Sequence, residues 1–135
     1  MTVAEKAYIA GIIDGEGSIL LTKQSKTQHH SPEVSVASTD VELLEWMKNV
    51  IGKGTIIRKK NYNCSKHKNS YAYSVVKDSA IRLLEEILPY LVINKKKARA
   101  EHILKKYKIV TVRNGKYNEE QLDAKLKFYK DFVAL

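Results

Sequence analysis

The stretch YIAGIIDGEGS, residues 8–18, constrains the fold most, because an apolar helix must end there and a strand must begin at once. Asp14 and Glu16 lie at the expected carboxyl end of that helix. Unpaired carbonyl groups already give this end partial negative charge, so the helix dipole disfavours two further acidic groups. The two carboxylates therefore require a compensating cation.

Hydrophobic periodicity along the chain predicts a helix, a hairpin, a second helix, a second hairpin and then further helices. Helices are expected over 3–14, 41–51 and 80–91, from Asn94 to about Thr111 and from Asn118 onward, and strands over 17–24, 31–38, 54–61 and 69–76. Gly15 is expected to end the first helix in a left-handed conformation, and Gly52 to stop the second. Thr39 or Asp40 is expected to cap the second helix, and Asp78 or Ser79 the third. Two hairpins with the helices grouped elsewhere predict an α+β fold, in which one face of a sheet packs on helices and the other is open. Because a chain of 135 residues can bury a core of its own, we expect residues 1–135 to form a single domain.

Alternation within the strands assigns their side chains to the two faces of the sheet. The core face is expected to receive Ile19, Leu21, Val34 and Val36. The open face is expected to carry mainly short polar and aromatic side chains with basic residues around them, namely Ser18, Leu20, Thr22, Gln24, Glu33, Ser35, Tyr71 and Tyr73, flanked by Lys26, Arg58, Lys59 and Lys60. Such a face suits the major groove of double-stranded DNA, which admits a two-stranded ribbon. An ordinary hydrated sheet face is the alternative.

The charge balance favours a polyanionic partner. The chain has 24 Lys and Arg against 15 Asp and Glu, a formal net charge of +9, and cationic contacts to phosphates release condensed counterions. A lysine-rich hydrated surface without a partner is the alternative. No apolar run approaches the roughly 20 residues that span a bilayer, and the N-terminus lacks a signal-peptide pattern. The single cysteine, Cys64, permits no internal disulfide, so we expect an intracellular protein, cytoplasmic or organellar, with no membrane partner.

Cys64 and His67 have a C-x-x-H spacing, and His29 and His30 lie in the other hairpin loop. Zinc would need all four side chains to converge, and no second pair at metal-ligand spacing supports that arrangement. We therefore expect these residues to lie in loops near a DNA backbone.

Small residues recur every four positions along the first helix, at Ala7, Gly11 and Gly15. One small residue per turn lets two helix backbones approach closely, so we expect two copies of this helix to pack through these three residues. That packing would bring two Glu16 carboxylates side by side, which is unfavourable unless a cation lies between them. Paired carboxylates a few ångströms apart suit a divalent-metal phosphodiesterase site.

At these residues the chain resembles the LAGLIDADG homing endonucleases. IAGIIDGEG, residues 9–17, matches their nine-residue motif position by position, with conservative apolar changes and Glu16 for the final aspartate. The segments TDVELLEWMKNVIGKGTI and LPYLVINKKKARAE are similar to the family as well, so the resemblance covers most of residues 5–110. It implies an αββαββα fold whose curved antiparallel sheet forms a DNA-binding saddle, here with additional C-terminal helices.

The resemblance also implies roles for single residues. Glu16 would bind the catalytic metal, with the Gly15 carbonyl as a further ligand, and Asp14 would form hydrogen bonds near the helix end. The catalytic lysine of the family aligns with an asparagine here, so the role passes to Lys95 or Lys96, two alternatives that differ by a rotation of about 100° around a helix. The implied ion is Mg²⁺, for which Mn²⁺ substitutes, whereas Ca²⁺ binds without supporting cleavage.

Members of the family with a single motif act as homodimers. The resemblance therefore implies a site-specific endonuclease that cleaves double-stranded DNA at a long, partly palindromic target, leaves 3′ overhangs and promotes intron mobility. One alternative on the same fold is a maturase, a splicing cofactor that binds intron RNA. A second alternative is a DNA-binding regulator without nuclease activity.

Overall fold

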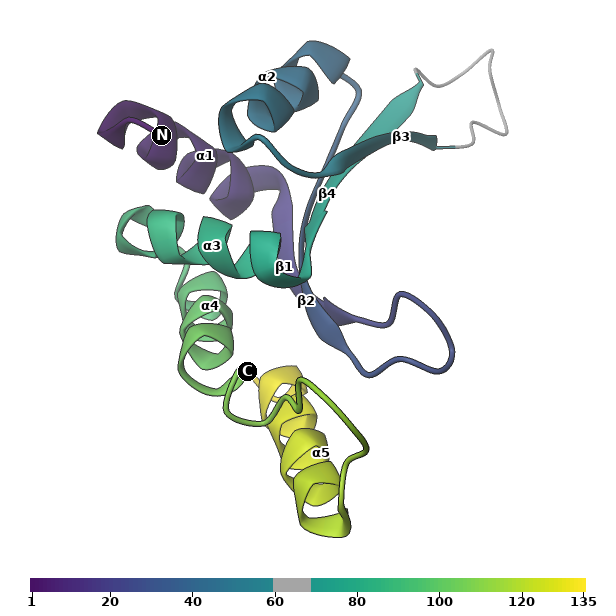
Figure 1. The fold of residues 1–135 in the computed structure, drawn as a ribbon. Helices are drawn as coiled ribbons and strands as arrows, with labels where there is room; N and C mark the ends of the chain where they lie inside the picture. Colours follow the sequence, from purple (N-terminus) through teal and green to yellow (C-terminus); the bar gives the residue numbers. More distant parts are fainter. Residues whose placement is uncertain (60–68) are drawn as a thin grey trace.

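The computed structural model describes residues 1–59 and 69–135 and confirms the α+β class (Figure 1). Its elements are α1 (Val3–Glu16), β1 (Gly17–Thr22), β2 (Ser31–Ser38), α2 (Val41–Ile51), β3 (Thr55–Lys59), β4 (Ser70–Val76), α3 (Lys77–Ile87), the 3₁₀ helix η1 (Leu88–Tyr90), α4 (Asn94–Lys106) and α5 (Glu119–Val133). The predicted order of helix, hairpin, helix, hairpin and further helices is confirmed.

The four strands form one antiparallel sheet in the order β1-β2-β4-β3. The two hairpins therefore meet through β2 and β4 in the middle of the sheet, and β1 and β3 are its edges. Helices α1, α2 and α3 lie on one side of the sheet, and within the described ranges no helix lies on the other side (Figure 1). This open side is the face that the strand alternation predicts.

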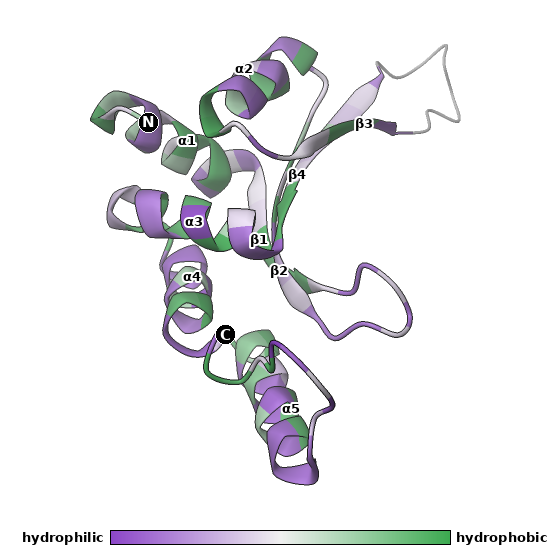
Figure 2. Cartoon of the chain, in the orientation of Figure 1, coloured by the Kyte–Doolittle hydropathy of each residue, from purple (hydrophilic) through white to green (hydrophobic). Residues whose placement is uncertain are grey.

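The core lies between the sheet and these three helices. The sheet contributes Ile19, Leu21, Val34 and Val36, all four on the face predicted for them. The helices contribute apolar side chains at helical spacing: Ile9 and Ile13 from α1, Leu44 and Met47 from α2, and Leu84 and Ile87 from α3. Hydrophobic and hydrophilic residues alternate around α2, α3 and α4, as expected for helices buried on one side (Figure 2).

Helix α1 runs two residues further than predicted, to Glu16, and passes directly into β1. Gly15 does not end it in a left-handed conformation; Gly17 ends it, in extended backbone with φ −94°. A Cβ atom on Gly17 would lie 2.8 Å from the Ile13 Cα, whereas a Cβ atom on Gly15 would meet nothing within 4 Å. Glycine is therefore required at position 17, where the chain turns back closely against the last helical turn.

The helix predicted over 80–91 is divided into two elements. Helix α3 begins at Lys77, before the predicted caps Asp78 and Ser79, and Lys77 itself has a left-handed φ of 54°. The helical path changes to the 3₁₀ helix η1 at the segment that contains Pro89. Proline has no N–H group with which to continue an α-helix, so the break follows from its chemistry.

Two predicted helix boundaries are confirmed. Gly52 follows α2 in the left-handed conformation, with φ 82°. Asn118 caps α5, because its side chain accepts a hydrogen bond at 2.8 Å from a backbone N–H in the first turn. By contrast, β1 ends two residues earlier than predicted, at Thr22, and α4 ends at Lys106 rather than near Thr111.

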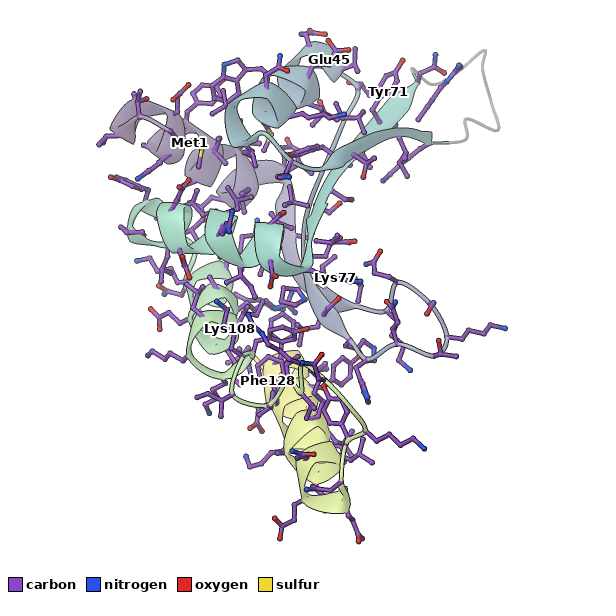
Figure 3. The ribbon with its side chains drawn as sticks, viewed as in Figure 1. Met1, Glu45, Tyr71, Lys77, Lys108 and Phe128 are labelled. Atoms are coloured by element: carbon purple, nitrogen blue, oxygen red, sulfur yellow. The ribbon has the colours of Figure 1, made fainter. Side chains whose placement is uncertain are left out.

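Helix α5 packs against α4 through aromatic side chains. His102 of α4 stacks on Phe128 with ring centroids 4.6 Å apart, and the Arg99 guanidinium lies 5.0 Å from the centre of the Phe132 ring. Phe128 accordingly lies where α5 meets the rest of the molecule (Figure 3). No helix in the described ranges has the length and apolar composition needed to cross a bilayer.

Candidate functional site

The carboxyl end of α1 brings several of the predicted site residues together. Glu16 is the last residue of α1 and is exposed. The Asp14 carboxylate accepts hydrogen bonds from the backbone N–H groups of Val92 at 2.9 Å and Ile93 at 3.1 Å. These N–H groups directly precede α4, so Asp14 joins the end of α1 to the start of α4. The hydrogen-bonding role expected for Asp14 is confirmed.

Lys96, in the first turn of α4, reaches the same end of α1. Its Nζ donates hydrogen bonds to the carbonyl oxygens of Ile13 at 2.7 Å and Asp14 at 2.6 Å. Both carbonyls belong to the last turn of α1, where the helix has unpaired acceptors and partial negative charge. The cation that two acidic groups at this helix end require is therefore in part the ammonium group of Lys96.

Lys95 and Lys96, the two alternatives from the sequence, differ in their contacts with α1. Lys95 is exposed and lies about 100° around the α4 axis from Lys96, which makes the contacts with α1. A lysine ammonium group has three N–H donors. Because two of those on Lys96 are bound to carbonyls, one N–H remains for another acceptor.

The metal ligands available from one chain are few. In the ranges 1–59 and 69–135, no three His, Cys, Asp or Glu side chains gather as a metal site. Zinc, which prefers nitrogen and sulfur ligands, does not fit the Glu16 carboxylate and the Gly15 carbonyl. Mg²⁺ fits them better, because it takes oxygen ligands, retains several water molecules and accepts phosphate oxygens from a substrate.

The open face of the sheet carries the side chains that β1 and β2 were predicted to place there. The strand register aligns two rows of side chains across the sheet, Ser18–Ser35–Ser74–Thr55 and Leu20–Glu33–Val76. Thr22 ends β1 on the same face, and Gln24 and Lys26 follow in the exposed loop. This face thus has a band of short hydroxyl side chains across all four strands.

Residues 9–107 match the model of the LAGLIDADG endonuclease family, a range that includes the acidic end of α1, the sheet and Lys96. The chain belongs to the LAGLIDADG endonuclease family. A comparison with curated proteins gives no significant match.

Solved homing endonucleases share the fold of this LAGLIDADG chain. I-CvuI in complex with its target is 21% identical, with a TM-score of 0.70 over 97% of this chain and 81% of that one. The archaeal intron-encoded I-Vdi141I, complexed with DNA, is 19% identical, with a TM-score of 0.64 over 97% and 83% of the two chains. The LAGLIDADG meganuclease I-AabMI, bound to uncleaved DNA, is 21% identical, with a TM-score of 0.68. The similarity includes 92% of this chain but only 43% of the I-AabMI chain.

The tyrosines of β4 lie on the helix-covered face, so their predicted place on the open face was wrong. Tyr73 is 1% exposed and its hydroxyl donates to the Lys53 carbonyl, so it is not available to contact DNA. This burial raises the pKa of Tyr73 to about 12. Tyr71 and Arg58 pair across the strands on that same face, where Arg58 Nη2 donates to the Asn69 Oδ1 at 3.0 Å.

The physical reason is that alternate side chains of a strand point to opposite faces of the sheet, but this alternation does not show which face the helices cover. On β4 the large aromatic set fills the core, and the small set of Ala72, Ser74 and Val76 lies on the open face. The pairing of Ser74 with Ser35, which assigns the face, joins strands distant in sequence and became known only from the structure. Lys59 extends the open face as predicted, in register with Ser70. Lys60, Cys64 and His67 lie outside the described residues.

The small-residue stripe of this LAGLIDADG helix is exposed. Ala7, Gly11 and Gly15 face away from the core, to which Ile9 and Ile13 are turned. In the described part of the chain, a Cβ atom on Gly11 or Gly15 would meet nothing within 4 Å beyond the adjacent backbone of its own helix. The fold of one copy therefore does not need glycine at these two positions, and the backbone of α1 is accessible to a second helix.

The histidines of the β1–β2 loop pack on aromatic residues near and within α5. His29 lies 4.5 Å from the Tyr117 ring, and His30 stacks on Tyr129 with centroids 4.0 Å apart. Partial burial, with Lys23 and His29 nearby, lowers the pKa of His30. These contacts fix the loop against the C-terminal helix, a use of the histidines that the sequence did not reveal.

Proposed function

We propose that the protein is a homodimeric, divalent-metal-dependent endonuclease that cuts double-stranded DNA at a long, partly palindromic target. It leaves 3′ overhangs and thereby promotes the mobility of the intron that encodes it. The observation that carries this proposal is the end of α1, where an exposed Glu16 follows carbonyls that Lys96 binds and precedes the first strand of the open sheet.

Charge and shape support DNA as the substrate. The chain has a net charge of +9, which favours a polyphosphate partner. Its open face presents polar rows on antiparallel strands, a form that the major groove admits. I-Vdi141I and I-AabMI, which share the fold, are complexed with DNA. We assign base contacts to the open face and phosphate contacts to basic residues at its margins, Lys26 and Lys59.

The residues at the end of α1 divide the catalytic work. Glu16 and the Gly15 carbonyl would hold Mg²⁺ or Mn²⁺, and Ca²⁺ would bind there without supporting cleavage. When bound, the ion supplies an acidified water molecule and positive charge for the leaving oxygen. The remaining N–H of Lys96 donates to a phosphate oxygen and offsets its negative charge. Asp14 fixes the start of α4, and with it the position of Lys96.

A second copy supplies what one chain lacks. Cutting both strands requires two reacting phosphates, whereas one chain has one Glu16 at the end of one α1. This chain covers only 43% of I-AabMI, so one copy accounts for less than half of a larger protein with the same fold. Two copies packed through Ala7, Gly11 and Gly15 would form a unit of comparable size, with the two Glu16 carboxylates side by side.

Cleavage of a defined duplex tests the proposal. The substrate joins the two sides of the intron insertion site, and the wild-type protein with Mg²⁺ is expected to cut both strands. Glu16→Gln should bind this duplex without cutting it, because the amide no longer offers a charged ligand. The matched control is Glu45→Gln, which changes an exposed glutamate of α2 and should leave cutting unchanged (Figure 3).

Three outcomes would contradict the proposal. Equal cutting by the wild-type protein and Glu16→Gln would exclude Glu16 from the mechanism. Tight binding of the duplex with no cutting under Mg²⁺ or Mn²⁺ would indicate a DNA-binding regulator. Preferential binding of the intron RNA, with assistance to its splicing by Glu16→Gln, would indicate a maturase.

A further inference from the structure

One row on the open face of the sheet is apolar from strand to strand. Strand register pairs Ala37 of β2 with Ala72 of β4, and Ala72 with Ile57 of the edge strand β3. Ile57 is 60% exposed, although its neighbour Ile56 packs against the core on the other face. We call these three residues the Ile57 row.

Polar rows lie on both sides of the Ile57 row. Ser35, Ser74 and Thr55 form the row on one side, and Ser70 with Lys59 forms the row on the other. Ala72 is 7% exposed, so Ile57 is the member of the row that is most accessible to a partner. The Ile57 row is a narrow apolar line between two polar rows, and the polar row of Ser35, Ser74 and Thr55 separates it from Leu20 and Val76, the other apolar side chains that the described strands place on this face.

The chemistry of the major groove offers one apolar partner for such a line. Base edges there present hydrogen-bond donors and acceptors, and the C5-methyl group of thymine is the apolar group among them. An isoleucine against any other edge would remove water from polar atoms without replacing the lost hydrogen bonds. Against a thymine methyl group, the same side chain buries apolar surface of both partners.

We propose that the Ile57 row recognises a thymine methyl group in the major groove of the target, with Ile57 as the specificity-determining side chain. This inference rests on the proposed function, because it requires the open face to lie on DNA. Lys59 places one positive charge in the adjacent row, and the net charge of +9 of the whole chain favours a polyphosphate partner. In a homodimer the preference occurs once in each half of the target.

Replacement of single thymines by deoxyuridine tests the proposal, because it removes one methyl group and keeps the base pair. Selection from a randomised duplex pool with the wild-type protein first defines the bound sequence. Each thymine of that sequence is then replaced in turn, and the dissociation constant is measured. We expect one position in each half-site to lose about fourfold in affinity, the effect of burying one methyl-sized group.

Ile57→Ser should lose the sensitivity to deoxyuridine at that position, because serine has no methyl group to contact the thymine methyl. Ile57 is largely exposed on an edge strand, so thermal unfolding should stay close to that of the wild type. The matched control is Ile109→Ser, which changes an isoleucine that is 81% exposed beyond the end of α4. This control should keep the sensitivity of the wild type.

The outcomes separate this inference from the proposed function. Wild-type binding that no deoxyuridine weakens would overturn the inference and leave the nuclease proposal standing, whether or not the variant folds. The same result follows if Ile57→Ser retains the sensitive position. Failure of the wild-type protein to select any duplex would overturn both proposals.

Discussion

Asp14 and Lys96 form a reciprocal pair of helix-end contacts. Asp14 belongs to the carboxyl end of α1, where the dipole disfavours it, but its carboxylate binds the N–H groups at the amino end of α4. Lys96 belongs to the amino end of α4, and its ammonium group binds the carbonyls at the carboxyl end of α1. Each charged side chain is thus unfavourable on its own helix and favourable on the other. The two acidic groups of the motif are explained by this exchange and by the metal proposed at Glu16.

We predict that Lys96→Met reduces the cleavage rate by about 10²-fold, the scale of a single positioned side chain in proton transfer or charge stabilisation. Lys95→Met is the matched control, since it removes the same charge one position away, and it should cut within about threefold of the wild type. Single-turnover cleavage with Mg²⁺ measures the two rates. Thermal unfolding and DNA affinity of Lys96→Met distinguish loss of chemistry from loss of structure. The assignment is wrong if Lys95→Met is the slower variant.

The sequence predicted most of the elements, because periodicity and caps are local signals. It placed β2 at 31–38 and α2 at 41–51, as the structure has them, and it identified Asn118 as the cap of α5. It failed where a contact distant in sequence decides the outcome. The face occupied by Tyr73 depends on where the helices pack, and the choice of Lys96 depends on a contact across 82 residues. The motif itself was accessible to sequence reasoning, and Lys96 was one of two alternatives, whereas the contacts that join Asp14 and Lys96 to the opposite helix were not.

The junction of α1 and β1 is an element boundary set by packing. We predict that Gly17→Ala lowers the free energy of unfolding by about 1–3 kcal/mol, because the added Cβ would lie 2.8 Å from the Ile13 Cα and the backbone must shift. Ser18→Ala changes the next residue, which is exposed, and should alter stability by no more than about 0.5 kcal/mol. Urea unfolding followed by circular dichroism measures both. Equal stability of Gly17→Ala and the wild type would show that this turn tolerates a side chain.

At the scale of the whole molecule, one copy offers few ligands for the proposed metal and has an exposed helix backbone. At the end of α1, the Asp14 carboxylate is bound to backbone N–H groups, which leaves Glu16 as the free carboxylate among the described residues there. The stripe of Ala7, Gly11 and Gly15 faces outward on the same helix. Helix α1 lies on the helix-covered side of the sheet, away from the open face (Figure 1). Packing of a second copy on α1 would therefore leave the open face of each copy uncovered.

The proposed dimer can be tested by a change that leaves the fold of one copy intact. We predict that Gly11→Val shifts the protein from dimer to monomer in sedimentation velocity, because a branched side chain separates the two helix backbones. Within one chain the new Cβ meets nothing within 4 Å, so circular dichroism and the thermal unfolding of the isolated chain should be retained. The matched control is Ala124→Val, which adds the same branch to an exposed position of α5 and should leave the protein dimeric.

The same variant connects assembly to activity. If two copies form the site, Gly11→Val should lose double-strand cutting together with dimerisation, and raising its concentration should restore both in parallel by mass action. Cutting at full rate by a protein that sediments as a monomer, free and on DNA, would contradict the two-copy site. In that case Gly11 and Gly15 would need another explanation, because the described part of a single chain has room for a side chain at both positions.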